Sequence, residues 1–332
     1  MVQGAPASAP FVYRRLVPLL ASLLPLPPTQ ALWAITQVSV VAAYAVLLWV
    51  MVSMLRLGVG ASCLAVATFM TSTRSLLLLQ NPFVIDSFSL LMMSLMLAAF
   101  LADRPTSFGL AAVTGILARE DCLFGAIGFL AARRRLAGAL IVLAALAAFA
   151  LPRWLHSGTS AGFLGFRQLL QASYYAKTYF AYGFMWPLSI VGLWLVRASA
   201  LRRLLPYFGC AIAGSFLSTL FAVDTTRMFM PILPVSVVAC AVLFDRLRTQ
   251  HLILAGWLVL GLANLVLALP NAMFPGSVEH IIELEDWYRR LVVPIALHQL
   301  AGLLLVAFSV RAVIVASGSD VVGGETIVGR LP

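Results

Sequence analysis

Four short stretches of the sequence carry ionisable side chains beside long apolar runs. They are Arg14–Arg15, Asp86, Arg119–Glu120–Asp121, and Asp224 with Arg227. An ionisable side chain near the depth of a membrane is costly, so each stretch is a candidate functional group. A guanidinium group suits phosphate oxygens, and a carboxylate can take a proton from a hydroxyl group. Their residue types therefore indicate chemistry on a phosphate-bearing substrate.

Each stretch also has a structural interpretation, which the sequence leaves open. Adjacent arginines can snorkel to a membrane interface, and Arg119–Glu120–Asp121 can form an internal ion pair that holds a helix break. Asp224 and Arg227 are spaced to share a helix face and pair, with Asp224 at an N-cap position. Asp86 precedes an apolar helix, where an N-cap role is the simplest interpretation.

The motifs of soluble nucleotide enzymes and metalloproteins are absent from the sequence. The 4 cysteines are scattered, the 4 histidines are isolated, and no CxxC or Cys/His spacing occurs. No glycine-rich phosphate loop or nucleophile elbow is present either. We therefore expect no disulfide framework, no metal site and no cofactor.

The composition indicates which elements must position these residues. Of the 332 residues, 62% are hydrophobic and only 10% are charged. Apolar runs of about 18 residues recur from end to end, and each is long enough to cross a hydrocarbon core. The net charge of +10 comes from basic residues that punctuate these runs, so we expect contact with membrane lipid and no nucleic-acid partner.

The predicted fold is an all-α polytopic integral membrane protein with about ten or eleven membrane segments. Apolar segments are predicted at 31–55, 61–79, 87–102, 107–118, 122–132, 136–151, 184–197, 204–222, 228–244, 252–269 and 292–316. Two of them, 107–118 and 122–132, are too short to cross alone if straight, and AREDC separates them. We expect an interfacial N-terminal part at 1–30, a bundle at 31–316 and a disordered cytoplasmic tail at 317–332.

The arginine pattern predicts which loops face the outside. Basic residues are more frequent in cytoplasmic loops. The cytoplasmic arginines are predicted to be Arg56, Arg104, Arg133, Arg134, Arg135, Arg197, Arg202, Arg203, Arg246, Arg248 and Arg311. The outer loops are then 80–86, 119–121, 152–183, 223–227 and 270–291. Within the last loop, 275–291 has the pattern of an amphipathic helix that lies in the interface plane.

Several stretches together resemble the GT-C superfamily of membrane glycosyltransferases over about 11–240. APFVYRRLVPLLASLLP is similar to the end of that superfamily's first outer loop, and NPFVIDSFSLLMMSLMLAAFLA is similar to the helix pair that follows. GLAAVTGILAREDCLFGAIGFLAARRR resembles its paired short helices with charges at their outer meeting point. VDTTRMFMPILPV resembles a late outer D-x-x-R segment before a proline-bearing helix.

The resemblance implies an inverting sugar transfer from a polyprenyl-phosphate donor to an extracytoplasmic acceptor at a bacterial inner membrane. Its site residues would be phosphate-binding Arg14, Arg15, Arg119 and Arg227, with Glu120, Asp121 or Asp224 handling the acceptor or orienting the arginines. A carboxylate would take the acceptor's proton, and cations would stabilise the departing phosphate. Only some members of the superfamily use a divalent metal.

One departure from the superfamily's pattern concerns the N-terminus. These enzymes usually begin with a transmembrane helix and an outer loop that bears the catalytic acid, whereas residues 1–30 contain no Asp or Glu. We expect that a helix and most of this loop are missing upstream. The alternatives to a missing upstream part are that the base lies elsewhere or that the chain is an inactive relative. The alternative functions are a transporter or flippase-like protein, which predicts charges at the bilayer midplane and repeat symmetry, and a non-catalytic membrane subunit.

Overall fold

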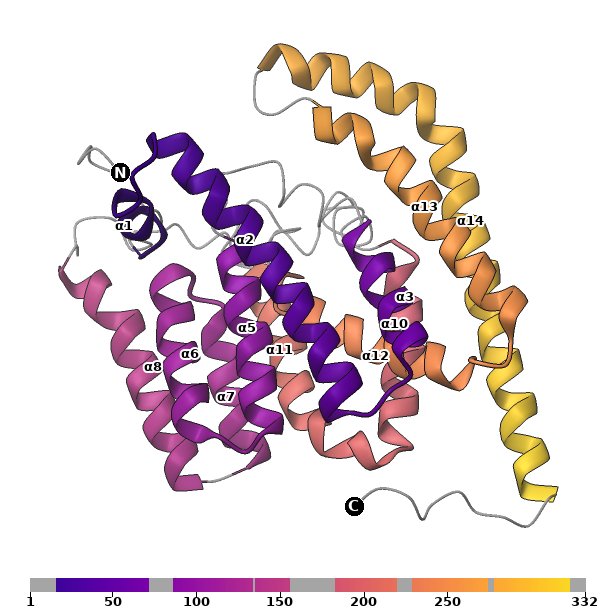
Figure 1. Ribbon diagram of the computed structural model, residues 1–332, viewed down its shortest axis with the longest axis horizontal. Helices are drawn as coiled ribbons and strands as arrows, with labels where there is room; N and C mark the ends of the chain where they lie inside the picture. The colour runs from indigo at the N-terminus through magenta and orange to yellow at the C-terminus, as the bar shows by residue number, and fades with distance from the viewer. Residues whose placement is uncertain are drawn as a thin grey trace. The chain divides into compact units, whose positions relative to one another are not determined.

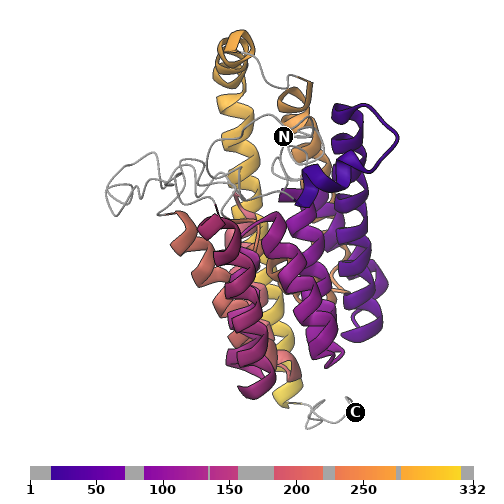
Figure 2. The same ribbon diagram turned by 90° about the vertical axis from the view of Figure 1, so that its left-hand side faces the viewer.

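A computed structural model describes residues 16–71, 86–133, 135–155, 183–219, 229–273 and 278–322, and its regular elements are all helices (Figures 1 and 2). The prediction of an all-α chain is confirmed for these residues. The contacts divide the chain into two compact units. Unit 1 is Met1–Val50, Leu77–Ala181 and Leu204–Val235; unit 2 is Met51–Leu76, Tyr182–Arg203 and Ser236–Pro332.

Unit 1 is built around helices that follow one another in the chain and pack side by side. Its helices are α1 (Leu16–Ser22), α2 (Pro28–Trp49), α5 (Asp86–Leu101), α6 (Pro105–Ala118), α7 (Cys122–Ala132), α8 (Arg135–Leu155), α11 (Leu205–Ser218) and the first turn of α12 (Ile232–Arg246). Helix α5 packs against α2 and α6, α8 packs against α6 and α7, and α11 packs against α7. Figure 1 shows α5, α6, α7 and α8 side by side.

Small residues allow α7 and α11 to approach closely. A Cβ atom added to Gly128 of α7 would lie 3.1 Å from the backbone oxygen of Tyr207 in α11. A Cβ atom at Gly214 of α11 would overlap the ring of Phe124 in α7. Glycine removes the side chain that would separate the two backbones, which is the usual device for close helix packing in an apolar medium.

One end of the α5–α6–α7 group carries an exposed ion pair. Asp103, in the turn between α5 and α6, lies 3.6 Å from Arg133 at the end of α7, and the two side chains are 40% and 24% exposed. The Arg133 guanidinium also lies 4.9 Å from the centre of the Phe100 ring, where a cation–π attraction is favourable. The Arg119 turn lies at the other end of α6.

Unit 2 contains the end of the first long helix and the C-terminal helices. It comprises η2 (Val50–Met54), α3 (Val59–Met70), α10 (Met185–Arg197), η4 (Ala200–Leu204), most of α12, α13 (His251–Met273) and α14 (Val278–Val322). Helix α13 packs against α14 and α3, and α10 packs against α14. The Gly58 amide at the start of α3 donates to Asp245 Oδ1 at 2.9 Å, which satisfies one of the orphan donors at that helix end.

The bounds of the helices follow the predicted segments closely, with one main difference. The predicted segment 122–132 has the same bounds as α7, and α6 begins two residues before the predicted 107. The helix predicted within 275–291 is present from Val278 onward. The prediction that 292–316 is a separate segment is wrong, because α14 is continuous from Val278 to Val322. Pro294 removes one hydrogen bond without ending this helix, and the tail predicted from 317 remains helical through Val322.

Two described helices are long and apolar enough to cross a membrane. They are Pro28–Met54 and Val293–Ala316. Other apolar helices, among them α3, α5, α6, α7 and α10, have between 10 and 17 residues. Most helices in the described part of the chain are therefore shorter than 18 residues, as was predicted for 107–118 and 122–132.

Candidate functional site

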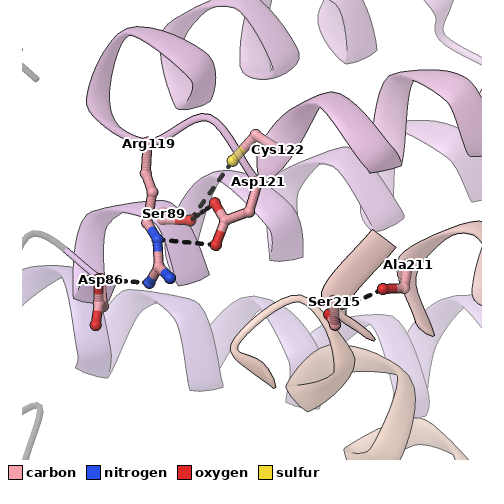
Figure 3. Close-up of polar contacts among 7 residues, drawn as sticks. All are labelled: Asp86, Ser89, Arg119, Asp121, Cys122, Ala211 and Ser215. Atoms are coloured by element: carbon pink, nitrogen blue, oxygen red, sulfur yellow. Dashed lines mark hydrogen bonds and ion pairs between the residues drawn. The ribbon is translucent and has the colours of Figure 1, made fainter. Parts of the chain in front are cut away.

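The turn between α6 and α7 holds a buried cluster of charged side chains (Figure 3). The Arg119 guanidinium lies between two carboxylates: its Nη1 atom is 2.5 Å from Asp86 Oδ1, and its Nε atom is 2.9 Å from Asp121 Oδ2. Asp86 begins α5, whereas Arg119 and Asp121 belong to the α6–α7 turn. The cluster therefore ties the start of α5 to this turn.

Asp121 uses both carboxylate oxygens in this cluster. While Oδ2 faces Arg119, Oδ1 accepts a hydrogen bond from Ser89 Oγ at 3.1 Å. Ser89 Oγ also lies 3.6 Å from Cys122 Sγ. Asp121 is thus held from α5 and from its own turn, which fixes its orientation.

Local backbone geometry explains why these side chains point inward. Helix α6 ends at Ala118 because Arg119 adopts an extended conformation, with φ −158° and ψ 131°. Asp121 occupies the N-cap position of α7, but its side chain makes no cap hydrogen bond. The carboxylate is therefore committed to Arg119 and Ser89 instead of to the helix end.

The three ion-paired side chains are almost completely withdrawn from the surface. Asp86, Arg119 and Asp121 are 0%, 1% and 2% exposed. Burial alone would lower the pKa of Arg119, but the negative charges of Asp121, Asp86 and Glu120 outweigh burial, so this pKa is raised. Arg119 stays charged, because the attraction of close carboxylates offsets the desolvation penalty of a buried charge.

Glu120 differs from its two neighbours in accessibility. It is half-buried, whereas Arg119 and Asp121 are buried on either side of it in the chain. Its charge acts on Arg119 through space. Of the three residues in the turn, Glu120 is the one whose side chain is partly exposed and could contact a substrate.

Other segments of unit 1 converge on the same turn. Ala118, directly before Arg119, is buried with Val17 of α1, and Leu16, Leu32, Ile35 and Phe88 pack against this pair. Leu16 directly follows Arg15 in the sequence. A helix that begins next to the predicted arginine pair thus packs beside the cluster.

A very small cavity brings the segment after Arg227 to the cluster as well. Its volume is about 10 Å³, and Asp121 lines it together with Pro231, Pro234 and Val235. Gly125 and Tyr207 also line this cavity. A space of this size holds one water molecule at most, so the cavity is a packing defect beside Asp121 and not a substrate pocket.

The predicted site residues fall into two groups. Arg119, Glu120 and Asp121 are described, and they lie together in the α6–α7 turn. Arg14, Arg15, Asp224 and Arg227 lie outside the described residues.

The sequence left two contacts of the cluster unidentified. Asp86, a candidate whose simplest interpretation was an N-cap, is the first residue of α5 and pairs with Arg119. Ser89 lies one turn further along α5 and donates to Asp121. Their spacing on one helix face was visible, but the helix they face could not be identified from periodicity.

Within the described ranges, no group of three or more His, Cys, Asp or Glu side chains could hold a metal ion. No protein-family model, no curated protein and no solved structure matches this chain.

Proposed function

We propose that the chain is a multi-pass membrane protein of the bacterial inner membrane. The support is the number of large apolar side chains at the surface of its helices. Helix α8 exposes Leu136, Leu140, Leu143, Leu151 and Trp154. Soluble proteins rarely expose contiguous apolar patches of this extent, whereas hydrocarbon tails are a suitable environment for them.

Within that membrane, the proposed activity is transfer of a sugar from a polyprenyl-phosphate donor to an extracytoplasmic acceptor. One observation carries this proposal beyond the sequence resemblance. Two described segments that follow candidate residues lie near the Arg119–Asp121 turn. Val17, two residues after Arg15, packs against Ala118, which directly precedes the turn, and Pro231–Val235 after Arg227 lines a small cavity together with Asp121. Convergence of these segments is what a single site made from all the candidates requires.

The geometry supports a division of roles among the charged residues. Arg119 has two carboxylates against it, and Asp121 has both oxygens engaged, so these are positioning residues in the proposal. Glu120 is the proposed general base, because it is the accessible carboxylate of the turn. Arg14, Arg15 and Arg227 remain the proposed phosphate-binding residues, with Asp224 as the orienting partner of Arg227.

The proposed reaction is a single displacement. The acceptor hydroxyl oxygen attacks the anomeric carbon, its proton passes to the Glu120 carboxylate, and the bond from carbon to phosphate oxygen breaks. The polyprenyl phosphate leaves with the electron pair of that bond, and arginine side chains stabilise its added negative charge.

Sugar transfer by membranes containing the full chain tests this proposal. We expect Glu120→Gln to lower the rate of transfer from polyprenyl-phosphate sugars by about 100-fold or more, because the amide cannot accept the proton. Asp103→Asn is the matched control, since it removes a carboxylate from the exposed ion pair at the other end of α6, and it should leave transfer unchanged. Equal rates for Glu120→Gln and wild type would contradict the proposal.

A non-catalytic membrane subunit is the second candidate function. The observation in its favour is the burial of Arg119 between Asp86 and Asp121, an arrangement that can serve stability alone. The subunit hypothesis predicts that the wild-type chain consumes no polyprenyl-phosphate sugar. It also predicts that Arg119 variants change the stability of the fold and nothing else.

A further inference from the structure

A wide groove runs between α13 and α14 in unit 2. Its volume is about 630 Å³. The wall is mostly apolar and includes Leu252, Ile253, Leu305, Phe308 and Val315. Leu252 is 90% exposed and Phe308 is 57% exposed, so the groove opens outward with its apolar surface uncovered by the described residues.

Two polar side chains lie in the wall of the same groove. Arg311 is exposed on α14, and Gln250 comes from the turn that leads into α13. Arg311 is one turn from both Phe308 and Val315, so it shares their helix face. Among the ion pairs found in the described residues, none involves Arg311.

The chain around Gln250 adds positive charge. Arg246 and Arg248 are both exposed in the segment that joins α12 to α13. The described carboxylate of that segment, Asp245, is half-buried and accepts a hydrogen bond from the Gly58 amide. This end of the α13–α14 pair therefore offers cations and hydrogen-bond donors next to an apolar groove.

The position of Arg311 along α14 matches the boundary between hydrocarbon and lipid head groups. The apolar stretch Val293–Ala316 is long enough to span a membrane, and Arg311 lies five residues before its end. At 1.5 Å per residue this is about 7.5 Å from the end of the span, within reach of an arginine side chain that extends to the interface.

The geometry points to a binding site for an anionic membrane phospholipid in this groove. Arg311 and Gln250 bind the phosphate head group, and an acyl chain lies along Leu252, Phe308 and Val315. A guanidinium group can hold two phosphate oxygens at once. An anionic head group carries no choline cation to oppose the positive charge of Arg311, so the site should prefer it to a zwitterionic one. The inference rests on the proposed membrane location but not on the proposed sugar transfer.

Native mass spectrometry of the purified, delipidated full chain tests the site. Phosphatidylglycerol and phosphatidylcholine are added separately, and the dissociation constant of each is measured. We expect the wild type to prefer phosphatidylglycerol. Arg311→Gln should weaken phosphatidylglycerol binding about tenfold and phosphatidylcholine binding by less, so that the preference for phosphatidylglycerol is lost. Arg311→Lys should retain part of the preference, which separates loss of charge from loss of folding.

Arg197→Gln is the matched control, because Arg197 is also exposed in unit 2 but lies at the end of α10, outside the groove. It should bind phosphatidylglycerol as the wild type does. Equal loss in Arg197→Gln and Arg311→Gln, or equal binding of the two lipids by the wild type, would overturn the inference. The inference would also be overturned if the chain were a dimer that does not bind phosphatidylglycerol, because a second copy would then cover the groove. Sugar transfer should be the same in Arg311→Gln and wild type, so failure of this inference is separable from failure of the proposed activity.

Discussion

Unit 1 buries an arginine between two carboxylates, whereas unit 2 leaves one exposed in a groove. Arg119 is 1% exposed and contacts two aspartates, while Arg311 lies in the wall of an open groove. A buried charge must have partners in the protein, so it is suited to positioning other residues. An exposed cation beside apolar surface can take its partner from the surroundings. We infer from this difference that the two arginines have different kinds of partner.

The helices of the two units are also held together differently. In unit 1 the polar link between α5 and the α6–α7 turn is ionic. In unit 2 the links between α13 and α14 are neutral: Trp257 Nε1 donates to Ser309 Oγ at 3.1 Å, and His298 Nε2 donates to the Leu260 oxygen at 2.9 Å. Removing one partner should therefore have a larger effect in unit 1 than in unit 2.

The largest effect is expected for Arg119→Met. This change leaves the carboxylates of Asp86 and Asp121 buried without their cation, and it should lower the free energy of unfolding by about 3–5 kcal/mol. The matched variant is Arg133→Gln, which breaks the exposed pair with Asp103 and should lower this free energy by about 1 kcal/mol or less. Denaturant titration in detergent micelles measures both, and equal losses would contradict the account of the buried cluster.

A smaller effect is expected from the glycine contacts within unit 1. Gly214→Ala places a methyl group against the Phe124 ring and should lower the free energy of unfolding by about 1–3 kcal/mol. Gly209 lies on the same helix, and a Cβ atom there meets nothing within 4 Å. Gly209→Ala should instead raise this free energy by up to about 1 kcal/mol. If both variants were destabilised alike in thermal melts, close packing of α7 and α11 would not be the cause.

The smallest effect is expected for Ser309→Ala in unit 2. Ser309 donates to the Leu305 oxygen and accepts from Trp257, whereas Ser94 in α5 donates to the Leu90 oxygen in the same helical pattern. Ser309→Ala should lower the free energy of unfolding by about 0.6 kcal/mol, the average for such contacts between membrane helices. Ser94→Ala removes only the bond within its own helix and should change it less. If Ser309→Ala lowered the free energy of unfolding as much as Arg119→Met does, the two units would not differ in how their helices are held together.

Helix positions were predictable from the sequence to a greater extent than the contacts between helices. Apolar runs bounded by charges or proline gave the bounds of α7 and nearly those of α6. The continuity of α14 was not predicted, because Pro294 and the charged stretch before it have the pattern of a break. The tertiary environment can maintain a helix through such a sequence.

The candidate site was predictable in part. The charged turn at Arg119–Asp121 stood out because it separates two short apolar segments. The partnership of Asp86 with Arg119 was not visible, since helical periodicity identifies a face but not the element that covers it. Nor could the sequence separate Glu120 from Asp121, because burial in this turn depends on how α5, α6 and α7 pack.

The most direct test of the central claim compares Glu120→Gln with Asp121→Asn in the same membranes. The measurement is the rate of sugar transfer per folded molecule, with the melting temperature recorded for each variant. Our account predicts that Glu120→Gln loses transfer in its folded fraction, whereas Asp121→Asn lowers the melting temperature more than Glu120→Gln does and its folded fraction retains transfer. Full transfer in folded Glu120→Gln together with none in folded Asp121→Asn would contradict it.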